Sequence, residues 1–128
     1  SLYIKKGIGR LSAYCGVVSA AAASAAGIAF MKQEKVDIIR NTLSNSLAAV
    51  SGIICDGAKP SCAMKIAVAV GTALLSYRQA QAHNSFQPGD GIVKADIDQT
   101  IAAVCAVAKK GMKETDIVIL NEMLANEG

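Results

Sequence analysis

Residues 11–31 read LSAYCGVVSAAAASAAGIAFM and carry no charge between Arg10 and Lys32. Length alone would allow this stretch to cross a bilayer. Its centre, residues 19–27, contains only alanine, serine and glycine. These residues contribute little free energy of transfer into lipid compared with leucine, isoleucine or phenylalanine. We therefore expect a helix inside a folded domain and no membrane span.

This alanine-rich helix is predicted to form the centre of the domain and to be buried on all sides. Small side chains allow neighbouring helices to approach closely. The residues expected to provide these close contacts are Gly16, Ala20, Ser24 and Gly27.

Periodic apolar residues predict further helices on the C-terminal side of the alanine-rich stretch. The expected ranges are 35–54, 60–82, from 95 or 96 to 111, and from 114 or 115 through 124, with a loop at 83–91. Pro60 suits the first position of its helix, because proline there loses no intrahelical hydrogen bond. The IVIL run at 117–120 could also be a strand, but the residues up to Asn126 favour a helix.

The composition fits one compact, all-α domain of about five helices. The chain has 128 residues, of which 52% are hydrophobic and only 4% aromatic, so small aliphatic residues must fill the core. The net charge of +3 is spread along the chain, which argues against nucleic-acid binding. No stretch resembles a secretory signal, and we expect a cytoplasmic location.

Four cysteines lie at positions 15, 55, 62 and 105. A disulfide framework is not expected, because helical segments separate them and no export signal is seen. The stretch ICDGAKPSCAMK at 54–65 places two thiols, one acid and two lysines around a tight turn before a helix N-terminus. The helix dipole there favours anions such as thiolates.

The spacing of Cys55 and Cys62 does not identify a metal site by itself. Six residues separate the two cysteines, unlike the two-residue spacing of zinc ribbons or the clustered cysteines of bacterial ferredoxins. Two buried structural thiols are an equally good interpretation of the pattern. Cys105 falls on the apolar face of its helix and is predicted to lie in the core.

Longer motifs are more specific. The stretch SGIICDGAKPSCAMK at 51–65 closely resembles the signature of the L-cysteine desulfidases and of uncharacterised bacterial relatives of the serine dehydratase alpha chain. Three other segments resemble the same family in the same order along the chain. They are RLSAYCG at 10–16, DGIV at 90–93 with DQTI at 98–101, and GMKETD at 111–116 with Ile119 and Leu120.

The resemblance implies an enzyme that uses a 4Fe-4S cluster and no pyridoxal phosphate. In that family three cysteines hold the cluster and leave one iron open to substrate. Cys15 and Cys55 match two of these ligands, whereas the third lies near the start of a much longer chain. Residues 1–128 therefore resemble the C-terminal helical domain of such a protein. Cys62 is a further candidate ligand, although the second downstream cysteine of serine dehydratases lies at a longer interval.

The implied reaction is β-elimination. It would convert L-cysteine to pyruvate, ammonia and hydrogen sulfide, or L-serine to pyruvate and ammonia. The expected partners are this small-molecule substrate, the N-terminal region of the same protein and a second copy of the chain, with neither nucleic acid nor a membrane. The alternative is a non-catalytic helical domain used for regulation or assembly.

Several polar residues are candidates for roles in this chemistry, each beside a simpler interpretation. Lys59 and Lys65 could bind a substrate carboxylate or be solvated charges at a helix start. His83 could act as general base or be an exposed loop histidine. Asp56 could orient the turn or cap the following helix, and capping is the more common role for aspartate at such a junction. Tyr14 could donate a hydrogen bond toward a cluster or simply pack.

Overall fold

The alanine-rich stretch forms helix α2 (Gly16–Met31) at the centre of a helical bundle. The computed structural model describes residues 1–9 and 12–126. Arg10 and Leu11, the first two residues of the RLSAYCG motif, lie outside the described residues, as do Glu127 and Gly128. The other helices are α1 (Leu2–Ile8), α3 (Val36–Val50), α4 (Cys62–Gln81), α5 (Ile97–Ala106), the π-helix η1 (Val107–Gly111) and α6 (Lys113–Ala125).

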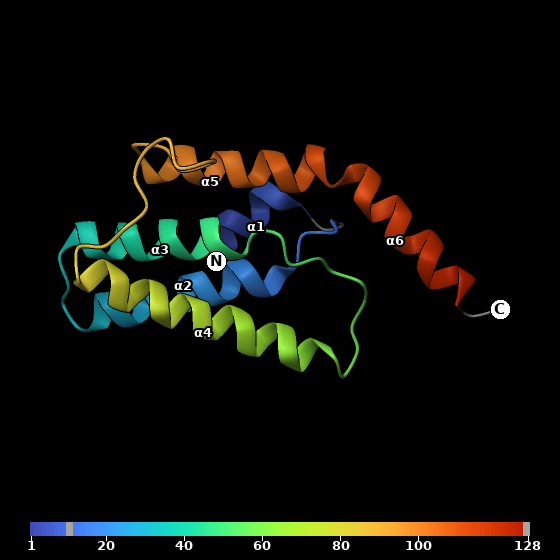
Figure 1. Cartoon of the computed structure of the whole chain (residues 1–128), viewed down its shortest axis with the longest axis horizontal. Coiled ribbons are helices and arrows are strands. Elements are labelled where there is room, and N and C mark those ends of the chain that lie inside the picture. Colours follow the sequence, from blue (N-terminus) through green and yellow to red (C-terminus); the bar gives the residue numbers. More distant parts are fainter. Residues whose placement is uncertain (10–11, 127–128) are drawn as a thin grey trace.

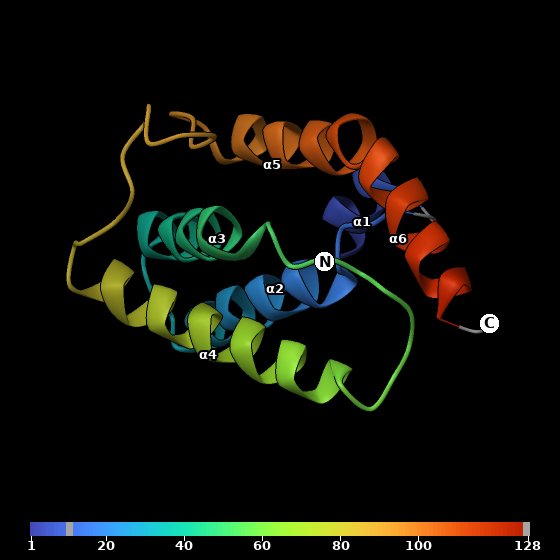
Figure 2. The same ribbon diagram turned by 45° about the vertical axis from the view of Figure 1, so that its right-hand side comes forward.

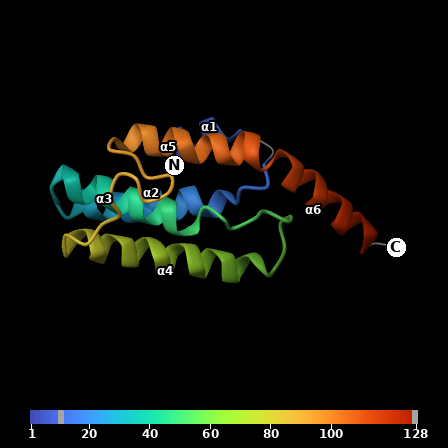
Figure 3. The same ribbon diagram turned by 45° about the horizontal axis from the view of Figure 1, so that its top comes forward.

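The prediction of a single all-α domain is confirmed. Helices α2, α3 and α4 pack against one another, and α5 lies across the other side of α3 (Figure 1). The short α1 packs between α2 and α5 (Figure 2). Helix α6 follows η1 and projects away from the bundle (Figure 3), and none of its residues is buried.

Two apolar clusters hold the bundle together. The larger one joins α1, α2, α3 and α5 through aliphatic residues such as Val18, Leu47 and Val104. The buried residues of the smaller one are all alanines, with Ala21 and Ala25 of α2 against Ala69 and Ala73 of α4. Because alanine adds a single methyl group beyond the backbone, these two helices can approach closely.

Helix α2 is buried on one side, so the prediction of burial on all sides is wrong. Its buried residues are Val18, Ser19, Ala21, Ala22, Ala25 and Ala29. The four small residues expected at close contacts, Gly16, Ala20, Ser24 and Gly27, are exposed. Small residues occupy every face of this helix, so the sequence has no amphipathic period that would distinguish the buried side from the exposed side.

The ends of some helices differ from those expected from the sequence, because tertiary contacts determine where the helix stops. Helix α3 ends at Val50 instead of Ile54, because Ile54 pairs with Tyr14 in an isolated antiparallel bridge. Helix α5 continues through η1 to Gly111, the predicted stop. Helix α1 was not predicted, and its Ile4 and Ile8 are buried one turn apart.

Across residues 1–9 and 12–126, no helix combines the length and the apolar character that crossing a membrane requires.

Candidate functional site

The candidate site forms where two segments far apart in sequence meet beside the N-terminus of α2. The amide of Cys15 donates a hydrogen bond to the carbonyl oxygen of Ile53 at 3.0 Å, and the amide of Cys55 donates one to the carbonyl oxygen of Ala13 at 2.6 Å. These two bonds flank the Tyr14–Ile54 pair. The backbone therefore brings the segments of Cys15 and Cys55 side by side.

The register of this bridge fixes how the two cysteines are related. Cys15 and Cys55 each follow one member of the Tyr14–Ile54 pair, so they are diagonal neighbours across the bridge. In regular antiparallel pairing such neighbours share one face and lie about 7–8 Å apart. All four cysteines of the chain are free thiols; Cys55 is exposed and Cys15 is half-buried.

Cys62 lies on the other side of the turn, as the first residue of α4. Its Sγ donates a hydrogen bond to the carbonyl oxygen of Gly57 at 3.4 Å. Gly57 has a φ of +95°, a left-handed conformation that glycine adopts without the penalty of a side chain. The glycine thus turns the chain back so that both Cys55 and Cys62 border the same loop.

Lys65 ties this loop to α4. Its Nζ donates a hydrogen bond to the carbonyl oxygen of Ile54 at 2.9 Å and another to Oδ1 of Asp56 at 2.5 Å. The hydrogen bond with Lys65 lowers the pKa of Asp56 and raises that of Lys65. The thiols of Cys15 and Cys62 lie close enough to raise the pKa of Lys65 further. The site thus combines thiols with a neighbouring cation.

Of the two roles considered for Asp56, capping is not observed, because the structure gives α4 no side-chain cap hydrogen bond. The carboxylate pairs with Lys65 instead. The sequence pattern did not reveal this pair, because nothing in the spacing of positions 56 and 65 indicates that a lysine in the first turn reaches back across the loop.

Tyr14 lies on the buried side of the bridge. Its hydroxyl shares a 3.0 Å hydrogen bond with Ser51 Oγ, and Ser51 Oγ donates one to the carbonyl oxygen of Leu47 at 2.5 Å. Burial raises the pKa of Tyr14. These hydrogen bonds join Tyr14 to the end of α3, so packing and anchoring account for its position.

A small cavity of about 100 Å³ opens beside the bridge. It reaches Cys55 and Tyr14 and continues along the start of α2. Its lining residues are Lys5, Ile8, Gly9, Ser12, Tyr14, Gly16, Ser19 and Cys55. Ser12 was not singled out from the sequence. It accepts a 3.1 Å hydrogen bond from the amide of Tyr14 and donates one to the carbonyl oxygen of Ala108 at 2.8 Å.

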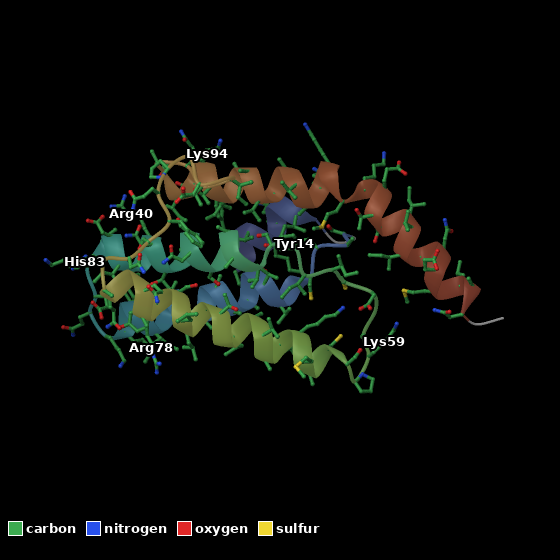
Figure 4. All side chains as sticks on the ribbon, in the orientation of Figure 1. Tyr14, Arg40, Lys59, Arg78, His83 and Lys94 are labelled. Carbon is green, nitrogen blue, oxygen red and sulfur yellow. The ribbon has the colours of Figure 1, made fainter. Side chains whose placement is uncertain are left out.

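The other candidates lie apart from the bridge. Figure 4 shows Lys59 at the same end of the bundle as Tyr14, with His83 at the opposite end. Lys59 and His83 are both exposed, and His83 lines a separate cavity of about 420 Å³ between α3 and the loop after α4. The structure therefore brings Cys15, Cys55, Cys62 and Lys65 together and leaves His83 away from them.

Cys105 is packed between helices, in line with its predicted place in the core. It is half-buried in α5, its Sγ lies 3.7 Å from the carbonyl oxygen of Ile4, and burial raises its pKa. In the part of the chain that the structure describes, no three histidine, cysteine, aspartate or glutamate side chains lie close enough together to hold a metal ion.

Comparison with known proteins shows one family over nearly the whole chain. The family model described as "Serine dehydratase alpha chain" matches residues 1–121. A UPF0597 protein of Finegoldia magna is 52% identical over 124 residues, which cover 97% of this chain and 30% of the relative. A UPF0597 protein of Treponema denticola is 53% identical and covers 97% of this chain and 29% of the relative.

A more distant UPF0597 protein, from Bacteroides fragilis, is 41% identical over 95% of this chain and 28% of its own length. The chain thus spans less than a third of the length of each of these curated relatives. No solved structure matches it.

Proposed function

Since the chain belongs to the serine dehydratase alpha chain family, we propose that it forms the cluster-binding, C-terminal helical part of an iron–sulfur lyase. The reaction would be β-elimination from L-cysteine or L-serine. The observation that carries the proposal is the bridge that pairs the segments of Cys15 and Cys55, the two cysteines that match cluster ligands of the family.

The residues around the bridge fit such a cofactor. Iron–sulfur clusters are held by cysteine thiolates, and both Cys15 and Cys55 are free thiols with at least part of their surface accessible. Lys65 places a cation beside the thiols of Cys15 and Cys62. In this proposal, another region of the protein completes the set of cluster ligands.

Each side chain has a separate task in this proposal. Cys15 and Cys55 would hold the cluster, and Cys62, half-buried at the start of α4, is a candidate for a further ligand or for a thiol that faces the substrate. When bound, a cluster with an open iron supplies a Lewis acid toward the leaving group. Lys59 is exposed on the same loop and is a candidate to bind the substrate carboxylate.

The partners follow from the same proposal. The substrate is an amino acid with a β-leaving group, either thiol or hydroxyl. The remaining ligand would come from the N-terminal region of a family-length protein, and we include a second copy of the chain among the partners. The protein would act in the cytoplasm and without pyridoxal phosphate.

Anaerobic reconstitution with iron and sulfide tests the proposal in a family-length protein that contains this segment. The expected result is a brown protein with thiolate-to-iron charge-transfer absorbance. Cys15→Ala and Cys55→Ala should each abolish this absorbance, and the matched control Cys105→Ala should retain it. A family-length protein that stays colourless would refute the proposal. Sulfide release from L-cysteine, measured against pyruvate release from L-serine, identifies the substrate.

A second candidate function is assembly without catalysis. Helix α4 exposes large apolar side chains, including Met64 at 71% and Ile66 at 50%, and Leu124 of α6 is 66% exposed. Exposed apolar side chains in such number are typical of surfaces that another chain or domain covers. Assembly alone would leave the pairing of Cys15 with Cys55 without a chemical role, and cluster reconstitution therefore separates the two functions.

A further inference from the structure

Lys65 reaches from the first turn of α4 back to the segment that carries Cys55. Its ammonium donates hydrogen bonds to the carbonyl oxygen of Ile54 and to the carboxylate of Asp56, at 2.9 and 2.5 Å. These two acceptors belong to the residues on either side of Cys55. We propose that Lys65 is a positioning residue that clamps the backbone around Cys55 and thereby fixes this cysteine beside Cys15.

The hydrogen bonds of Lys65 support a bridge that is short. Among the described residues, two backbone hydrogen bonds join the segments at the bridge, from Cys15 to Ile53 and from Cys55 to Ala13. A two-stranded contact of this length has little stability of its own in water. Tyr14 and Ile54 form a non-hydrogen-bonded pair, so the carbonyl oxygen of Ile54 is not used in the bridge. Lys65 occupies that free acceptor.

The chemistry of lysine suits this role. An ammonium group has three donors, and Lys65 directs two of them at the Cys55 segment. Bonds with a charged donor are stronger than neutral ones, and the lysine side chain is only 23% exposed, which limits competition from water. With two donors engaged, Lys65 is better suited to hold the loop than to bind a substrate carboxylate.

The clamp also connects the three thiols of the site. Lys65 lies one turn after Cys62 on α4, so the same side chain relates the start of that helix to the Cys55 segment. The Cys55 segment in turn pairs with the segment of Cys15. Lys65 therefore contributes to the relative positions of all three cysteines.

Amide hydrogen exchange on the 128-residue chain tests this inference. Lys65→Met should speed exchange at the bridge amides of Cys15 and Cys55 by about tenfold, because two charge-assisted hydrogen bonds are lost. Lys65→Arg keeps the charge and the donors, and it should restore most of the protection. The control Arg78→Met removes an exposed cation from the same helix and should leave both amides at their original rates.

A second variant keeps the test valid if Lys65→Met does not fold. Asp56→Asn leaves Lys65 in place and removes the charge of one acceptor, and about threefold faster exchange is expected at Cys55. Original exchange rates in every folded variant would overturn the inference. Equal loss of protection in Lys65→Met and Lys65→Arg would overturn it as well, because the loss would then not depend on the charge and the hydrogen-bond donors that arginine keeps.

The role of Lys65 in cluster binding rests on the proposed function, but exchange is measured without a cluster. A protein that stays colourless after reconstitution would therefore refute the proposed function, but it would not change the result of the exchange experiment.

Discussion

The amide of Cys55 donates a hydrogen bond to the carbonyl oxygen of Ala13 at 2.6 Å. This contact joins the segment before α2 to the segment before α4, and the two helices pack behind it through alanines. The spacing of the cysteines is therefore a consequence of helix packing as well as of the loop. Substitutions of residues that hold the bridge in place should therefore change both the free energy of unfolding and the properties of the site.

Ser12→Ala should destabilise the chain by about 1–3 kcal/mol, because it removes the partner of two backbone groups. Ser12 Oγ donates to the carbonyl oxygen of Ala108 and accepts from the amide of Tyr14. The measurement is urea unfolding followed by circular dichroism. Ser24→Ala is the control, since Ser24 is exposed and bonds only within its own helix. It should change stability by less than about 0.5 kcal/mol.

Gly7→Ala should destabilise the docking of α1 against α5. A Cβ atom at Gly7 would lie 2.4 Å from Sγ of Cys105, and overpacking of this kind costs about 1–3 kcal/mol. Adding Cys105→Ala should recover part of the loss, so a double-mutant cycle of unfolding free energies measures the contact. If the two changes are additive, the close approach does not limit stability.

Gly27→Ala is the matched control for Gly7→Ala. It is also a helical glycine, but a Cβ atom there meets nothing within 4 Å. Alanine has the higher helix propensity, so this change should stabilise the chain by up to about 1 kcal/mol. The opposite signs of the two substitutions would separate steric contact from propensity.

The existence of α3, α4 and α5 was predictable from the sequence, but α3 ends at Val50 instead of Ile54 and α4 begins at Cys62 instead of Pro60. The choice of helix over strand for the segment up to Asn126 was also confirmed by α6. Helix α1 was missed because it is short and contains Gly7, and glycine has a low helix propensity. The exposed side of α2 was missed because alanine, serine and glycine occur all around it.

The site could be predicted only in part. The resemblance to a family, and not the spacing of the residues, connected Cys15 with Cys55, because segments that pair across a fold share no local pattern. Lys65 was seen as a candidate to bind substrate or as a solvated charge, whereas the structure engages it with Ile54 and Asp56. The reach of a long side chain across a turn depends on backbone geometry that composition does not encode.

Tyr77→Phe should reduce stability at neutral pH and have a smaller effect in acid. The hydroxyl of Tyr77 donates to Glu34 Oε1 at 2.7 Å, and this bond lowers the pKa of Glu34. A lowered carboxyl pKa means that the stabilisation is present above the ordinary glutamate range and is lost as the pH falls through the lowered value. The check is the difference in urea midpoint between wild type and variant across that range.

The control for Tyr77→Phe is Tyr3→Phe, since Tyr3 is 65% exposed. Its effect should be small and independent of pH. If the difference in urea midpoint between wild type and Tyr77→Phe stays the same from neutral to acid pH, the contribution of the Tyr77 hydroxyl does not depend on the charge of Glu34.

Gly57→Ala should cost about 1–2 kcal/mol, because an alanine at a φ of +95° is strained by its own backbone. The added Cβ would also lie 3.1 Å from Cε of Met123, but that methyl is the end of a flexible side chain and can move. We therefore expect backbone strain to dominate. Urea unfolding gives the cost, and Gly52→Ala, with open space and no positive φ, is the control.

Two further measurements decide where the strain of Gly57→Ala acts. If the backbone is the cause, combining it with Met123→Ala should not restore stability, whereas full recovery would assign the cost to the contact with α6. Strain at position 57 should also weaken the hydrogen bond that Cys62 Sγ donates to the carbonyl oxygen of this residue, so that the turn opens. Alkylation of the half-buried Cys62 should then be faster than in wild type at the same pH. Cys105 of α5, which packs against α1, is the control and should react at its original rate.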